Sequence, residues 1–160
     1  MNAQRVLAAG IMIVMTLASA ACSKNDSSPT GTTANGSMSA KIDGGSWGAT
    51  TIQATWSNGV LGLGGSQISG SENKQITIAG LVSQTGTYQI GLISGITGTY
   101  AEGSTGGVKT FSAQSGTLQV DQLSASGAKG SFSIEVQEQT SSGPGTAKRS
   151  VTEGKFDVKF

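Results

Sequence analysis

The residue best placed for chemistry is Cys22, the single cysteine of a 160-residue chain. Ahead of it, Met1–Arg5 carries one positive charge, Val6–Leu17 carries none, and the small residues Ala18–Ala21 lead directly to the thiol. A charged start, an apolar centre and a small-residue cleavage site are typical of a secretory signal. We therefore expect residues 1–21 to be removed. An unpaired cysteine in an exported protein then needs an intermolecular partner or a modification.

The junction between Ala21 and Cys22 resembles the lipobox of bacterial lipoproteins. In that class the cysteine thiol is diacylated and the new amino group is acylated, so the resemblance implies lipid attachment at Cys22. An alternative stays open: cleavage at an A-x-A site within Ala18–Ala20 leaves a free thiol near the new N-terminus. A retained transmembrane helix is disfavoured, because a bilayer core needs about 20 apolar residues and Val6–Leu17 is shorter.

Composition excludes several classes of site. The chain has no histidine, which removes Ser–His and Cys–His catalytic pairs and histidine-ligated metals. Once Arg5 is cleaved off, the charged residues balance, and this neutrality argues against a nucleic-acid partner. Oxygen ligands for Ca²⁺ or Mg²⁺ are the one metal chemistry left. We expect no cofactor.

Carboxylates are the remaining catalytic candidates, because paired acids hydrolyse glycosidic bonds. No spacing in the sequence certifies that two of them meet, and the neighbours of several are typical of solvated strand faces. The sequence therefore favours a non-catalytic binding or interaction module; the alternative is a carboxylate-dependent hydrolase or lyase acting on a surface polysaccharide. The available acids are Glu102, Asp121, Glu135, Glu138, Glu153 and Asp157.

Aromatic side chains offer a second kind of site, a stacking platform for a sugar. Most of the aromatics alternate with apolar residues and are expected in the core: Trp56, Tyr88, Phe132 and Phe156. Only Trp47, between Ser46 and Gly48, and Tyr100, before Ala101, have loop-like surroundings. We take Trp47 and Tyr100 as the possible ligand-contacting residues.

The segments that must position these residues change character at residue 38. Cys22–Ser37 is rich in Ser, Thr, Asn and Gly, which predicts a flexible tether. From residue 38 to Phe160, apolar residues recur with a period of two, as in half-buried strands. Asp43-Gly44 and Asn58-Gly59 predict hairpin turns. No helical periodicity follows Cys22, so we expect an all-β domain: an antiparallel β-sandwich or partly closed β-barrel of about 8–10 short strands.

Two segments are assigned less regular structure. The glycine-rich stretch 92–107 is expected to be a long loop interrupted by a short strand at Thr99–Ala101. Ser141–Gly145 is expected to be an exposed turn. At the end of the chain Phe156, Val158 and Phe160 alternate with charged residues, which predicts a final strand paired inside the sheet.

Several segments together resemble a family of small lipoproteins of Bacteroidota-type bacteria. The resemblance lies in Ser39–Trp47, Gly86–Gly91, Ser115–Val120, Lys129–Ile134 and Thr152–Val158, plus the Cys-Ser-Lys start. Members carry one all-β domain of unassigned function. The resemblance implies a lipoprotein anchored through Cys22, with surface exposure left open. We expect it in the outer membrane, with the membrane itself and a glycan or an envelope protein as its partners.

Overall fold

The computed structural model describes residues 35–160, and the signal and most of the tether lie outside this range. The described part is all-β, as the sequence predicts, and it contains ten strands and no helix. The strands are β1 (Gly36–Ile42), β2 (Gly45–Gly48), β3 (Thr51–Ser57), β4 (Val60–Ser69), β5 (Glu72–Leu81), β6 (Gly86–Ile90), β7 (Ile96–Ser104), β8 (Gly107–Ser124), β9 (Gly127–Thr140) and β10 (Gly143–Lys159). Within this range, no helix is long and apolar enough to cross a membrane.

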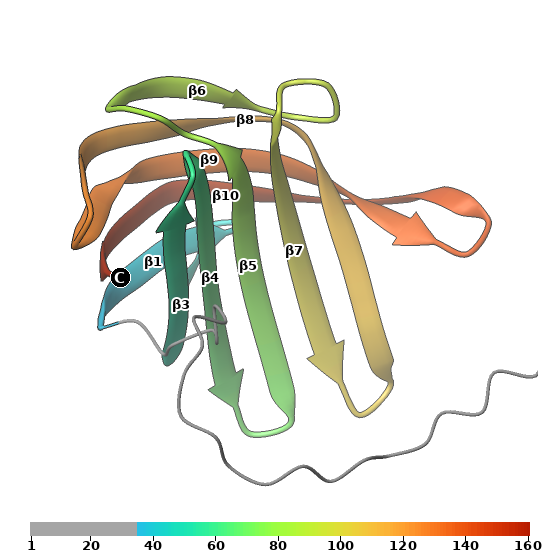
Figure 1. Cartoon of the computed structure of the whole chain (residues 1–160). Coiled ribbons are helices and arrows are strands. Elements are labelled where there is room, and N and C mark those ends of the chain that lie inside the picture. Colours follow the sequence, from blue (N-terminus) through green and yellow to red (C-terminus); the bar gives the residue numbers. More distant parts are fainter. Residues whose placement is uncertain (1–34) are drawn as a thin grey trace, which may run out of the picture.

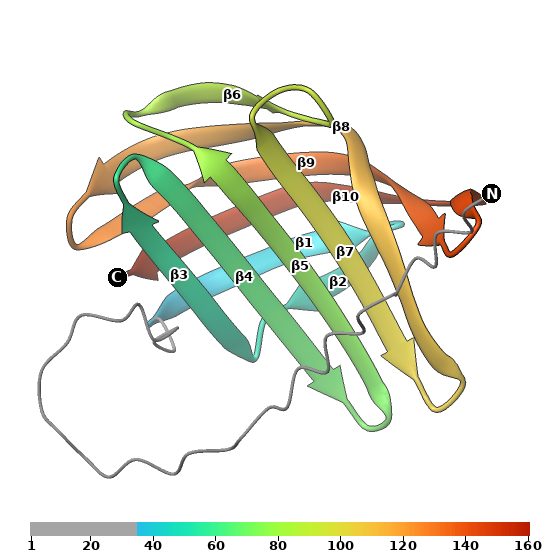
Figure 2. The ribbon, with the colours of Figure 1, turned by 45° about the vertical axis from the view of Figure 1, so that its right-hand side comes forward.

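All strands belong to one antiparallel sheet in the order β2-β1-β10-β9-β8-β7-β5-β4-β3, with β6 paired to β8. The path ends at β2 and β3 without joining them, so the sheet is open and not closed into a barrel. It folds over on itself. Figures 1 and 2 show one half, made of β3, β4, β5, β7 and the start of β8, lying across the other half, made of β1, β2, β6, β9, β10 and the rest of β8.

The fold of the sheet is made by β8, which serves both halves. Residues 107–112 of β8 pair with β7, and residues 116–120 pair with β6. Between these two stretches, the pairing of β8 with β9 shifts register between Ala113 and Ser115. A bulge of this kind bends a strand and increases its twist. The three C-terminal strands, β8, β9 and β10, are 14 to 18 residues long and so exceed the short strands expected from the sequence.

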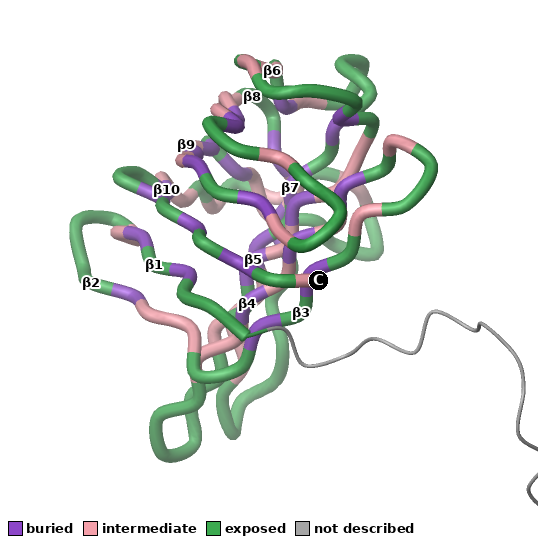
Figure 3. The backbone as a smooth tube through the Cα atoms, turned by 60° about the vertical axis from the view of Figure 1, so that its left-hand side comes forward, coloured by how far each residue is buried: buried purple, intermediate pink, exposed green. Residues whose placement is uncertain are grey.

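The core lies between the two halves of the sheet. Buried residues alternate with exposed ones along much of the sheet, as the colours of the backbone in Figure 3 show. The largest fully buried side chains include Tyr100, Phe111 and Phe156. Both predicted hairpin turns are present, and Asp43, Gly44, Asn58 and Gly59 all have positive φ, the geometry that two-residue hairpins of type I′ require.

One assignment from the sequence is wrong. The predicted loop at 92–107 contains β7, a nine-residue strand that pairs on both sides, with β5 and β8. Glycine obscured it: Gly98 is the third residue of the strand, at a position where a Cβ would lie 3.2 Å from Ala113 and 3.3 Å from Ile90. At the start of the domain, β1 includes Gly36 and Ser37, which the sequence places in the tether.

Candidate functional site

Three charged side chains occupy neighbouring inward positions where the apolar core ends. Lys74 on β5 lies directly opposite Glu102 on β7, and Glu102 lies directly opposite Lys109 on β8. Two residues further into the fold, the inward positions of the same strands are fully buried: Ile76, Tyr100 and Phe111. On all three strands the inward residues therefore change from apolar to charged at the same level, the row formed by Lys74, Glu102 and Lys109.

Glu102 is held in place through both of its carboxylate oxygens. The Tyr100 hydroxyl donates a hydrogen bond to Oε2 at 3.0 Å. Arg149 on β10 donates from Nη2 to Oε1 at 2.9 Å. Because β7 and β10 belong to opposite halves of the folded sheet, this ion pair links the two halves across the end of the core.

Arg149 is the centre of the charged cluster. Its Nε lies 3.4 Å from Oδ2 of Asp43, which comes from the turn between β1 and β2. Asp43 is itself fixed, because the backbone N–H of Ser150 donates to its Oδ1 at 2.9 Å. The guanidinium carbon lies 5.4 Å from the ring centroid of Phe111, within the range of a cation–π contact. The hydrogen bond to Glu102 raises the pKa of Arg149, so this residue stays charged.

Tyr100 acts as a hydrogen-bond donor in this arrangement. Burial raises the pKa of its phenol well above the ordinary value, and the negative charge of Glu102 and the hydrogen bond to it raise the pKa further. The phenol is therefore protonated throughout the physiological range. Its ring packs against Phe111 with centroids 5.5 Å apart, which joins the charged cluster to the core.

A cavity of about 400 Å³ opens over this row, a size that suits a small ligand. We call it the Glu102 groove, and its lining is Glu72, Lys74, Glu102, Gly103, Ser104, Gly106, Gly107, Val108 and Lys109. Lys74 and Lys109 each contact one carboxylate at 3.7 Å, Glu72 and Glu138 respectively. Their side chains are 39% and 58% exposed, so both ammonium groups can donate hydrogen bonds to a ligand.

Metal chemistry has no support in the part of the chain that the structure describes. No group of three or more carboxylate, histidine or cysteine residues between 35 and 160 is arranged to hold a metal ion. The two carboxylates that line the Glu102 groove, Glu72 and Glu102, each contact a cation, Lys74 and Arg149. The groove thus offers cations and hydrogen-bond donors, a chemistry suited to holding an acidic group.

The two aromatic residues that the sequence offers for ligand contact are not at the surface. Trp47 lies in β2 and is 3% exposed, and its indole N–H donates to the carbonyl oxygen of Lys74 at 3.3 Å. Tyr100 lies in β7 and is fully buried. The expectation of loop-like, accessible rings is therefore wrong for both: each occupies an inward position in a strand, where burial of a large ring stabilises the core. Cys22 and Ala21 lie outside the described residues.

The groove residues were missed because each looked unremarkable in isolation. In the sequence Glu102 is one of several carboxylates, and nothing distinguishes Lys74 or Lys109 from other lysines. The signal lies in alternation: Tyr100 and Glu102 are two residues apart, so in a strand they share a face. That relationship holds only if this segment is a strand, and its glycines favour a loop.

The domain belongs to a family without an assigned activity. Residues 34–157 match the family model described as a domain of unknown function (DUF6252), and the chain is a member of that family. No curated protein matches the chain. No solved structure matches it either.

Proposed function

We propose that this protein is a lipid-anchored component of the bacterial outer membrane whose β domain is a non-catalytic binding module. The Glu102 groove is its ligand site. The observation that carries the binding role is the row Lys74, Glu102, Lys109 on three adjacent strands, at the mouth of a cavity of about 400 Å³.

The groove suits a ligand with an acidic group. Arg149 balances the charge of Glu102 at 2.9 Å. Lys74 and Lys109 contact the carboxylates of Glu72 and Glu138 at a longer distance, 3.7 Å in both cases. An incoming carboxylate or phosphate can form short, charge-assisted hydrogen bonds with both ammonium groups. An acidic glycan of the cell envelope presents such groups.

The arrangement of Glu102 supports binding over hydrolysis. A catalytic pair needs one carboxyl group free to give a proton and another free to attack or to activate water. Both oxygens of Glu102 already accept hydrogen bonds, from Tyr100 and Arg149. Depolymerisation of a glycan by the purified protein, seen as new reducing ends, would favour the hydrolase alternative.

Binding is tested on an array of uronate-bearing, phosphorylated and neutral glycans, with residues 35–160, which include the whole described core. We expect binding to an acidic class and a loss of about tenfold for Lys74→Gln or Lys109→Gln, the effect of about 1.4 kcal/mol for a charge-assisted bond. Lys129→Gln is the matched control. Lys129 is an exposed lysine outside the groove, and its ammonium group lies 3.0 Å from the carboxylate of Asp157. An equal loss in the control, or binding to neutral glycans alone, contradicts the proposed site.

The anchor rests on Cys22 and the apolar segment before it, and the family match begins only at residue 34, downstream of that cysteine. Stable attachment to a membrane takes more than one acyl chain, because each buried CH₂ contributes about 0.8 kcal/mol. Cys22→Ser should therefore release the protein from the membrane fraction. Mass spectrometry of the mature N-terminus is decisive, since an unmodified chain starting at Ala21 would contradict the anchor.

A further inference from the structure

The outer face of one half of the sheet carries no charged side chain. We define the neutral face as the outward positions of β3, β4, β5, β7 and residues 107–112 of β8. Thr77 is at its centre: the register places Gly64 and Thr99 on either side of it, with Gln53 and Ser112 beyond them. Every other outward position on these stretches is also uncharged, because their charged residues, Glu72, Lys74, Glu102 and Lys109, take inward positions.

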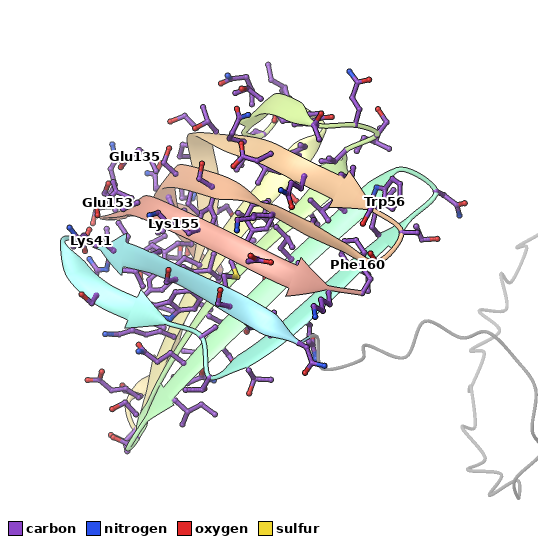
Figure 4. The ribbon with its side chains drawn as sticks, turned by 90° about the vertical axis from the view of Figure 1, so that its left-hand side faces the viewer. Lys41, Trp56, Glu135, Glu153, Lys155 and Phe160 are labelled. Carbon is purple, nitrogen blue, oxygen red and sulfur yellow. The ribbon has the colours of Figure 1, made fainter. Side chains whose placement is uncertain are left out.

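The other half of the sheet has the opposite character. Its outward positions include the exposed residues Lys129, Glu135, Lys155 and Asp157. Figure 4 looks at this half and labels Glu135 and Lys155 on it, together with the ion pair of Lys41 and Glu153 at 2.8 Å. Charged outward side chains keep a sheet face solvated. Their absence from the neutral face distinguishes two surfaces of the same domain.

Exposed apolar side chains gather on the neutral face. Of the six large apolar residues that the structure exposes among residues 35–160, four point outward from it. Val60 and Leu81 lie opposite each other at one end, with exposed fractions of 45% and 65%. Ile68 and Val108 lie at the other end, at 61% and 74%. The uncharged, polar centre of the neutral face is thus flanked at both ends by exposed apolar groups, and a partner that covers the face also covers these groups.

We propose that the neutral face binds the neutral face of a second copy of this chain. A surface that meets its own copy brings identical groups together. The neutral face can do so without like-charge repulsion, which the face carrying Lys129 and Lys155 cannot. At its centre Gly62 and Gly64 have no side chains, so two sheets can approach to the spacing of about 10 Å at which sheet faces pack.

The size of the neutral face is sufficient for such a dimer. Five strands about 4.8 Å apart and seven residues long at about 3.3 Å each cover about 550 Å² per copy. Two copies therefore bury about 1,100 Å² in total, at the lower end of specific interfaces. We expect a weak, reversible dimer. Gly103 and Val108 belong both to the neutral face and to the lining of the Glu102 groove, so the dimer borders the groove at this end.

Sedimentation velocity on residues 35–160, from about 1 μM to about 1 mM, covers the affinities expected for an interface of this size. We expect a concentration-dependent dimer. Thr77→Lys and Leu81→Lys should each weaken association at least tenfold, since each buries an unpaired charge in the dimer. Gln89→Lys on β6 adds the same charge to the other half and should leave association unchanged. Circular dichroism checks that all three variants fold.

Four results would overturn the proposal, the fourth of them in a mixing experiment. The first is a monomer at the highest concentration. The second is a dimer that both Thr77→Lys and Leu81→Lys leave intact, and the third is equal weakening by Gln89→Lys. A mixture of Thr77→Lys and Thr77→Glu adds a stringent test, because Thr77 lies near the centre and meets its own counterpart. Association should return in the mixture, and a mixture that stays monomeric contradicts the face-to-face arrangement.

Discussion

The ring of Phe156 on β10 lies over Gly130, its direct partner on β9. A Cβ built at Gly130 would come within 2.8 Å of Cζ of this ring and would overlap the backbone oxygen of Gln119 on β8. Phe132 and Gly154 repeat the relationship in the same pair of strands, with the aromatic residue on β9. Two large rings thus fill the space left by two glycines, which explains how a chain with 25 glycines builds a dense core.

The first prediction concerns this packing. Gly130→Ala should destabilise the domain toward the upper end of the range of about 1–3 kcal/mol typical of overpacked cores, because backbone on one side and a ring on the other block the new methyl group. Gly48→Ala is the control: nothing lies within 4 Å of a Cβ there, so its effect should stay within about 0.5 kcal/mol. Urea melts compare the two. Equal stability of both variants would show that the β8–β9–β10 packing is looser than described.

The second prediction concerns the last strand. Phe156 is 2% exposed, and Phe160 is only partly buried. Phe156→Ala should cost about 3–5 kcal/mol, the penalty for emptying a buried phenylalanine site. Phe160→Ala should cost less, because terminal residues fray. Urea melts of the two variants give the order.

The control for Phe156→Ala lies on the opposite face of β10. Asp157 and Lys159 are exposed, as the alternation in the sequence predicts. Asp157→Asn and Lys159→Gln should each change stability by no more than about 0.5 kcal/mol. A charge variant as costly as Phe156→Ala would reverse the assignment of faces in β10.

The alternation of apolar and polar residues predicted most of the fold. Phe132 and Phe156 are buried as predicted, and Leu61, Leu63, Ile76 and Ile78 follow the same period of two, because a strand with one buried face must place apolar residues at every second position. Where glycine or threonine replaces the apolar residues, the signal disappears. Gly98 and Thr99 obscured β7 in the sequence, although Gly98 is inward and a Cβ there would be crowded by Ala113 and Ile90.

The candidate site was harder to foresee, because its parts are distant in sequence. Glu102 and Arg149 are 47 residues apart, and Asp43 precedes Ser150 by 107 residues. Only the pairing order of β1, β10, β7 and β5 brings them to one end of the core. Local pattern predicts which face a residue occupies, but it contains no information about which strands become neighbours across a folded sheet.

The third prediction concerns the ion pair between the two halves of the sheet. Arg149→Gln should destabilise the domain by about 1–3 kcal/mol, because it leaves the largely buried carboxylate of Glu102 without its cation and removes the contact with Phe111. Lys41→Gln breaks an ion pair of similar length that is 43% and 64% exposed, and it should cost less than about 1 kcal/mol. Thermal melts compare the two. If both variants cost the same, Arg149 contributes no more than a surface charge.

The last prediction uses the raised pKa of Tyr100. The folded state holds the phenolic proton more tightly than the unfolded state, in which the pKa is about 10. The resulting stabilisation is fully present below pH 10. It is lost as the pH rises above 10 towards the higher folded value, with a slope of about 1.4 kcal/mol per pH unit.

Tyr100→Phe cannot titrate, so this part of the alkaline loss should vanish, even though the variant starts less stable without the hydrogen bond to Glu102. Urea melts of the wild-type protein and of Tyr100→Phe between pH 8 and pH 11 measure how stability changes with pH in each. The upper limit lies about one unit above the unfolded pKa. Identical slopes in the two proteins would mean that Tyr100 ionises in the folded state as readily as in the unfolded chain, so that neither burial nor the hydrogen bond to Glu102 holds the phenolic proton.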